Sequence, residues 1–94
     1  MVGGKPKDFL DRLYSCQDTV FIYKHIKYWF QGYMPDKNSV HMEIFQYQPS
    51  SERNVWEYDG ATIDECLKAF IHAKIWNGKS FWDVEQEMEW VDWF

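Results

Sequence analysis

The chain has 94 residues and a formal net charge of −5, which fits one globular domain and leaves no basic stripe for direct binding of nucleic acid. At 46% hydrophobic residues it is too apolar for a disordered tail, yet no run approaches the roughly 20 apolar residues of a membrane-spanning helix. Its two cysteines, without a signal peptide, indicate reduced thiols rather than a disulfide framework. We therefore expect one cytoplasmic domain over residues 1–94 that has no membrane partner.

The first part of the chain is expected to form a helix. Gly3, Gly4 and Pro6 break regular structure, so residues 1–6 are interpreted as a flexible lead-in. Apolar residues then recur at helical spacing between residues 7 and 16 and indicate one short amphipathic helix. These apolar residues are Phe9, Leu10, Leu13 and Cys16.

Residues 18–33 alternate with a period of two and are rich in β-branched and aromatic side chains, which is typical of strands. A turn near His25–Ile26 would pair Ile22 with Trp29 in a hairpin. One face of this hairpin then carries an aromatic set that is expected to pack on the helices. The set comprises Phe21, Tyr23, Tyr28 and Phe30.

More of the sheet should follow a loop over residues 34–38. Residues 40–48 alternate again and predict a third strand. Residues 49–54 are interpreted as a polar loop, and residues 55–58 as a short fourth strand. The sheet is therefore expected to have three or four antiparallel strands.

Two helices are expected after the sheet. Thr62 and Glu65 form a capping-box pattern at the start of a helix that runs to about Trp76, where Asn77–Gly78 supplies a left-handed C-cap. Ser80 then begins a last helix, whose inward residues share a helical spacing. They are Phe81, Val84, Met88 and Val91. The whole pattern predicts an α+β fold with an N-terminal helix and two C-terminal helices.

The apolar faces of these elements should form one core between the sheet and the helices. Its expected members are Phe9, Leu13, Phe21, Tyr23, Tyr28, Phe30, Val40, Met42, Ile44, Leu67, Phe70, Val84 and Met88. The opposite face of the sheet keeps an apolar group, namely Ile22, Trp29, Phe45 and Tyr47. A contiguous exposed patch of this kind usually marks an interaction site.

The excess negative charge lies in residues 80–94, which contain five acids and no lysine or arginine. On the predicted last helix, Glu85, Glu89 and Asp92 form a ridge of like charges, which stability alone would not favour. This ridge, with Trp93 as a further contact residue, predicts binding to a protein with a basic surface. The alternative is an ordinary solvated face of the helix.

No motif for catalysis, for a cofactor or for a metal is recognised. The sequence lacks a Gly-rich phosphate loop and a nucleophile elbow. Cys16 and Cys66 are interpreted as core residues. The histidines, His25, His41 and His72, have no metal-ligand spacing. We therefore expect a protein that is not an enzyme.

The predicted order of elements, the small size and the acidic charge resemble those of certain type II anti-CRISPR proteins. The local similarity is greatest over Thr62–Met88, where Ile63–Ile71 precedes the Asn77–Gly78 cap and an acidic aromatic segment. This chain is richer in tryptophan, and its acids lie on the last predicted helix rather than in loops around the sheet. The resemblance implies a prophage-encoded inhibitor that occupies the DNA-reading cleft of an RNA-guided nuclease by mimicking nucleic-acid charge. It assigns no role to an individual residue.

Two classes of function follow from these observations. The favoured one is a small interaction module of phage or bacterial origin that binds a basic protein surface. The alternative is a housekeeping domain that forms a homodimer through the aromatic face of its sheet.

Overall fold

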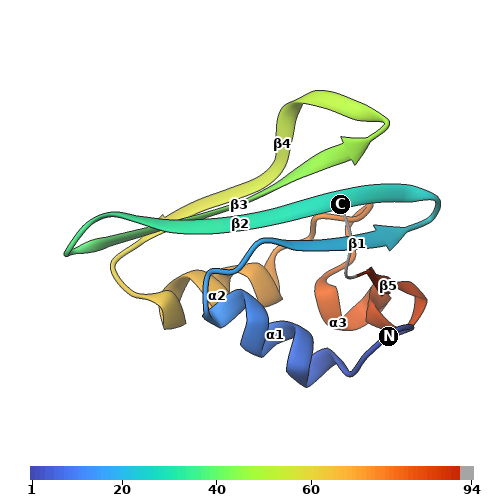
Figure 1. The fold of residues 1–94 in the computed structure, drawn as a ribbon, viewed down its shortest axis with the longest axis horizontal. Coiled ribbons are helices and arrows are strands. Elements are labelled where there is room, and N and C mark those ends of the chain that lie inside the picture. Colours follow the sequence, from blue (N-terminus) through green and yellow to red (C-terminus); the bar gives the residue numbers. More distant parts are fainter. Residues whose placement is uncertain (92–94) are drawn as a thin grey trace.

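The computed structural model describes residues 1–91 as an antiparallel sheet with helices on one face (Figure 1). The elements in chain order are α1 (Pro6–Tyr14), β1 (Thr19–Tyr23), β2 (Ile26–Asp36), β3 (Ser39–Gln48), β4 (Ser50–Gly60), α2 (Ile63–His72), α3 (Phe81–Val84), the 3-10 turn Glu85–Glu87 and β5 (Glu89–Val91). The five strands are arranged in the order β4-β3-β2-β1-β5. The predicted α+β fold is confirmed.

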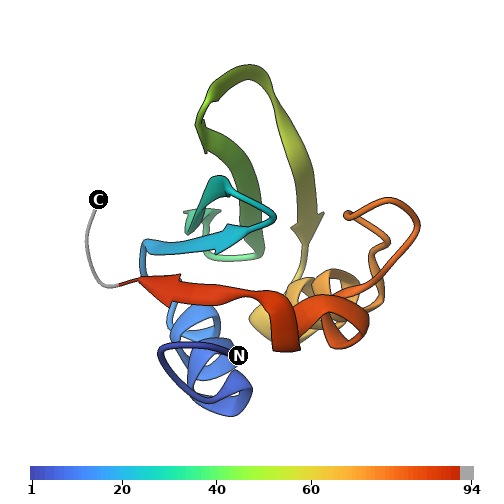
Figure 2. The ribbon, with the colours of Figure 1, turned by 90° about the vertical axis from the view of Figure 1, so that its right-hand side faces the viewer.

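All three α-helices lie on the same side of the sheet, and the β3–β4 hairpin bends away from them (Figures 1 and 2). A β-bulge between Ile44 and Phe45, where β3 pairs with β4, lies in this bent hairpin. Within residues 1–91, no helix covers the opposite side of the sheet (Figure 1). We call this side the open face and the helical side the packed face; Val20 and Val91, which lie on the open face, are nevertheless buried.

The core fills the space between the packed face and the helices. Every residue of the expected core is buried except Leu67, which is half-buried and packs at its margin. Aromatic rings dominate: Phe9 stacks on Phe81 at 5.7 Å between ring centroids, and Phe70 meets Trp56 edge-on at 5.6 Å. Such pairs add to the free energy gained by burying their area.

The first hairpin has the expected faces but a different register. Lys24 and His25 both have positive φ, of 51° and 67°, so they form the two-residue turn themselves. Val20 therefore pairs with Trp29, and Ile22 pairs with Lys27 rather than with Trp29. Each residue of β1 thus pairs with a residue of β2 that lies two positions earlier than predicted. An even shift of this kind leaves each side chain on its predicted face.

The second half of the sheet is longer than expected. β2 continues through residues 34–36, which were predicted to be a loop, and the chain turns between Asp36 and Ser39. The predicted polar loop over residues 49–54 is also wrong, because the chain reverses at Pro49 and β4 begins at Ser50. Ser50 pairs with Tyr47 and Asn54 pairs with Phe45, so both ends of this polar segment are held against β3 despite its low strand propensity.

The helices after the sheet are shorter than expected. Thr62 caps α2 as predicted, since its hydroxyl oxygen accepts from the Glu65 N–H at 3.1 Å, but the helix ends at His72. Asn77 and Gly78, with φ of 56° and 79°, form a tight turn between Trp76 and Lys79 instead of a C-cap. Ser80 starts α3 with its N–H donating to Asp83 at 2.9 Å.

The predicted long last helix is wrong, because α3 stops at Val84 and the chain passes through a 3-10 turn into β5. Of the residues predicted to point inward, Phe81, Val84 and Met88 belong to the core. Val91 is also buried, but it pairs with Val20, the partner of Trp29, and so lies on the face away from the helices. The spacing of the first three residues fits a helix, and it also fits a short helical turn.

The first residues of the chain are hydrogen-bonded rather than a free lead-in. The Val2 N–H donates to the Met88 carbonyl and the Trp90 N–H donates to the Val2 carbonyl, both at 2.8 Å. Trp90 covers Gly3 and Gly4 so closely that a Cβ at either glycine would collide with it. This contact fixes β5 between β1 and the start of the chain.

Candidate interaction face

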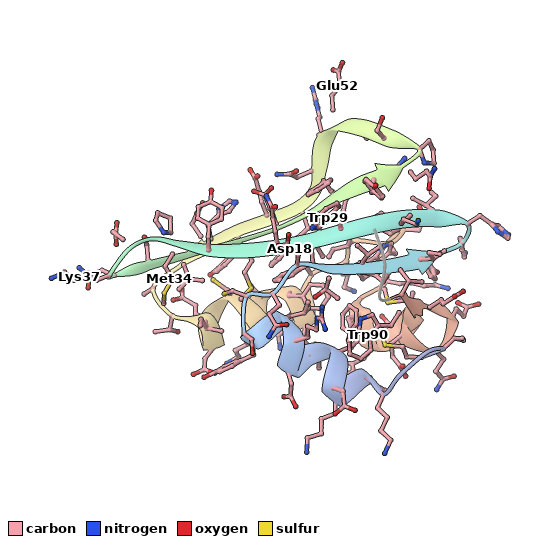
Figure 3. All side chains as sticks on the ribbon, in the orientation of Figure 1. Asp18, Trp29, Met34, Lys37, Glu52 and Trp90 are labelled. Atoms are coloured by element: carbon pink, nitrogen blue, oxygen red, sulfur yellow. The ribbon has the colours of Figure 1, made fainter. Side chains whose placement is uncertain are left out.

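The aromatic group predicted from the sequence gathers on the open face. Trp29 stacks on Phe45 with ring centroids 5.7 Å apart and meets Tyr47 edge-on at 5.3 Å. Trp29 lies on the side of the sheet away from the helices, whereas Trp90 lies on the helical side (Figure 3). Ile22 is on the same face as Trp29, because it lies two residues from Val20, the partner of Trp29 in β1. We call Ile22, Trp29, Phe45 and Tyr47 the aromatic cluster; all four are half-buried.

Carboxylates lie on both sides of the aromatic cluster. Glu89 on β5 is paired with Ile22 and therefore shares its face. On the other side, Glu43 on β3 is paired with Glu57 on β4, and Asp59 is paired with His41. The open face thus has an aromatic centre between two acidic margins, with the Lys27 ammonium 5.6 Å from the centroid of the Tyr47 ring.

His41 links the acids of the β3–β4 margin. Its Nδ1 lies 2.7 Å from Asp59 Oδ1, and its Nε2 lies 2.7 Å from Glu43 Oε1. Burial opposes protonation of the imidazole, but the hydrogen bonds and charges of the two carboxylates outweigh it and raise the pKa of His41 above its ordinary value. The margin is therefore a connected network rather than a set of separate surface acids.

The acids Glu85 and Glu89 do not form the predicted ridge of like charges in the structure. Glu85 is only 8% exposed, and its carboxylate lies 3.0 Å from the amino group of Met1. Glu89 is exposed on β5, so Glu85 and Glu89 are not neighbours on a helix as predicted. Asp92 and Trp93 lie outside the described residues. Of the predicted acidic contacts, Glu89 is the one that the structure places beside the aromatic cluster.

Both cysteines belong to the packed side of the sheet. Cys66 is fully buried, and its thiol lies 3.5 Å from the Val40 carbonyl oxygen. Burial raises the pKa of the Cys66 thiol, and it raises that of the Cys16 thiol as well. Thiols of this kind are poor nucleophiles at neutral pH.

Sequence reasoning missed the network around His41. Its signal is visible in retrospect, because His41 and Glu43 are two residues apart in β3, as Glu57 and Asp59 are in β4. Only the register of β3 against β4 brings the two pairs together. The prediction of β4 as a short strand gave no such register.

Comparisons with protein families, with curated proteins and with solved structures found no match for this chain. Within residues 1–91, no helix is long and apolar enough to cross a membrane.

Proposed function

We propose that the protein is a non-enzymatic interaction module whose open sheet face binds a partner protein with a basic surface. The observation that carries this proposal is the arrangement of that face, an aromatic centre between the acids of β5 and the acids of β3–β4. The packed face and the helices serve to hold this surface in place.

Each part of the face has a separate role in binding. Trp and Tyr are the residues that most often dominate the energy of protein interfaces, since they bury a large area with few rotatable bonds. The surrounding carboxylates steer a cationic partner toward the face and fix its orientation. Glu43, Glu57, Asp59 and Glu89 supply this negative potential.

A phage origin would specify the partner further. In an inhibitor of a bacterial defence nuclease, the basic surface would be the cleft that binds nucleic acid, whose Lys and Arg side chains otherwise contact phosphates. Self-association through the same face is the alternative. It is disfavoured because a dimer would gather the carboxylates of both copies in one interface.

The test compares association of matched variants with a partner captured from a bacterial lysate. Asp59→Asn combined with Glu89→Gln should slow association roughly tenfold at low ionic strength and much less at high salt, because steering is screened within about 10 Å at 0.1 M salt. Glu52→Gln is the control, since Glu52 lies at the far end of the bent hairpin (Figure 3).

Equal association rates for the double variant, the control and the unaltered protein would contradict the proposal. A stable dimer in sedimentation, abolished by Phe45→Ala, would favour self-association instead.

A further inference from the structure

Three side chains of the β3–β4 margin have the chemistry of metal ligands. His41 offers an imidazole nitrogen, and Glu43 and Glu57 offer carboxylate oxygens. The ligand atoms all lie within 4.8 Å of one another. In a tetrahedral zinc site, with bonds of about 2.0–2.2 Å, the ligand atoms are roughly 3.3 Å apart. Rotations of the side chains are therefore enough to bring the three onto one ion.

Each of these side chains is oriented by a neighbour that is not itself a ligand. Asp59 accepts from the His41 Nδ1 at 2.7 Å, which directs Nε2 toward the carboxylates. The Gln31 amide donates to Glu43 Oε2 at 2.8 Å, and the Asn54 amide donates to Glu57 Oε2 at 2.8 Å. Metal sites in proteins characteristically have such outer partners, including a carboxylate on the far nitrogen of a ligating histidine.

The charge of this group, and the burial of two of its members, distinguish it from ordinary surface acids. The side chains of His41 and Glu43 are only 12% and 16% exposed, whereas Glu57 is exposed. Glu43 and Glu57 are directly paired across the ladder, and like charges in that position destabilise a sheet. A divalent cation between them would convert this repulsion into attraction.

We propose that His41 Nε2, Glu43 and Glu57 bind a divalent transition-metal ion, with Zn²⁺ as the best match to one nitrogen and two carboxylate oxygens. Calcium and magnesium prefer oxygen ligands alone, and calcium needs six or more of them. Asp59, Gln31 and Asn54 are positioning residues. Three protein ligands leave the fourth position of the ion open to water or to a group on a partner.

The bound ion would link β3 to β4 where the hairpin leaves the helical layer. It would also neutralise two carboxylates of the open face, so the ion and a cationic partner would compete. This inference goes beyond the interaction proposal and does not depend on it, because the isolated protein is enough to test it.

The test is a calorimetric titration of the whole protein with ZnCl₂ after treatment with a chelator, with MgCl₂ as a comparison. We expect one zinc ion to bind per chain and magnesium to bind far more weakly. Glu57→Gln should weaken zinc binding at least tenfold, and Asp59→Asn should weaken it by about 10- to 100-fold. Glu52→Gln removes the same charge from the same strand, away from the cluster, and should leave the affinity unchanged.

Melting temperatures measured in chelator separate loss of a ligand from loss of the fold. Glu57→Gln removes a repulsion and should not lower the melting temperature of the metal-free protein. The proposal is overturned if zinc does not bind saturably, or if it binds the Glu57→Gln and Asp59→Asn variants as tightly as the unaltered protein. The latter result would place the ion elsewhere, for example on a thiol.

Discussion

The two faces of β3 differ sharply although they are made by alternate residues of one strand. Val40, Met42 and Ile44 point to the helices and are at most 1% exposed. His41 and Glu43 point the other way and are hydrogen-bonded to neighbouring strands, His41 to Asp59 on β4 and Glu43 to Gln31 on β2. The packed side therefore carries most of the stability of the fold, whereas the open side is free to carry ionisable and aromatic groups for binding.

The largest expected effect tests the packed face. Phe70 on α2 is fully buried and contacts Trp56, Trp76 and Phe81. Phe70→Ala should lower the free energy of unfolding by about 3–5 kcal/mol, because it removes a ring and leaves a cavity. Urea unfolding followed by tryptophan fluorescence measures this change, and a loss below about 1 kcal/mol would show that the helices are not firmly packed on the sheet.

A smaller effect on stability is expected on the open face. Phe45→Ala removes a half-buried ring that stacks on Trp29. It should cost about 1–2 kcal/mol in unfolding free energy, since only part of the ring's area is taken from water. The affinity for the captured partner should fall by much more than the small loss of folded protein alone would explain. If Phe45→Ala destabilises the protein as much as Phe70→Ala, the open face belongs to the core.

The smallest effect concerns a polar contact of the helical layer. Hydrogen bonds from the Ser80 N–H and hydroxyl lower the pKa of Asp83 in the folded protein. A lowered pKa means that the ionised carboxylate stabilises the fold above its unfolded pKa of about 4, and that this contribution disappears as the pH falls through the lower folded value.

Asp83→Asn should therefore slightly lower the melting temperature at neutral pH and make less difference near pH 3. Thermal unfolding monitored by circular dichroism over this range checks it, with Glu87→Gln as an exposed charge-matched control. A deficit that stays constant with pH would contradict a role for the ionised cap.

The local patterns of the sequence predicted most of the packed face. Alternation in residues 40–48 identified the inward set of β3, and the aromatic alternation of the first hairpin identified its buried side. The register of that hairpin was missed because Lys24 and His25 adopt left-handed conformations without the usual glycine or asparagine. The faces of the hairpin were still predicted correctly, because a register shift of two residues leaves every side chain on the same face of the sheet.

Features that depend on distant partners were not predictable in the same way. The polar start of β4 is a strand because β3 offers it hydrogen bonds, and Val2 is ordered because it bonds to Met88 and Trp90. The network around His41 likewise needs β4 in register with β3. In the C-terminal segment, the spacing of Phe81, Val84 and Met88 suits a helix and also suits the observed turn, so periodicity alone cannot decide.

The position of β5 has a consequence for how the chain is made. During synthesis, β1 to β4 can pair as successive hairpins while they leave the ribosome, but the outer edge of β1 stays unpaired until Glu89–Val91 emerges. That edge carries Val20, Phe21 and Ile22, and an apolar strand with an open edge readily pairs with other chains. The growing chain is thus prone to aggregate until Glu89–Val91 has emerged, and β5 removes that hazard by covering β1.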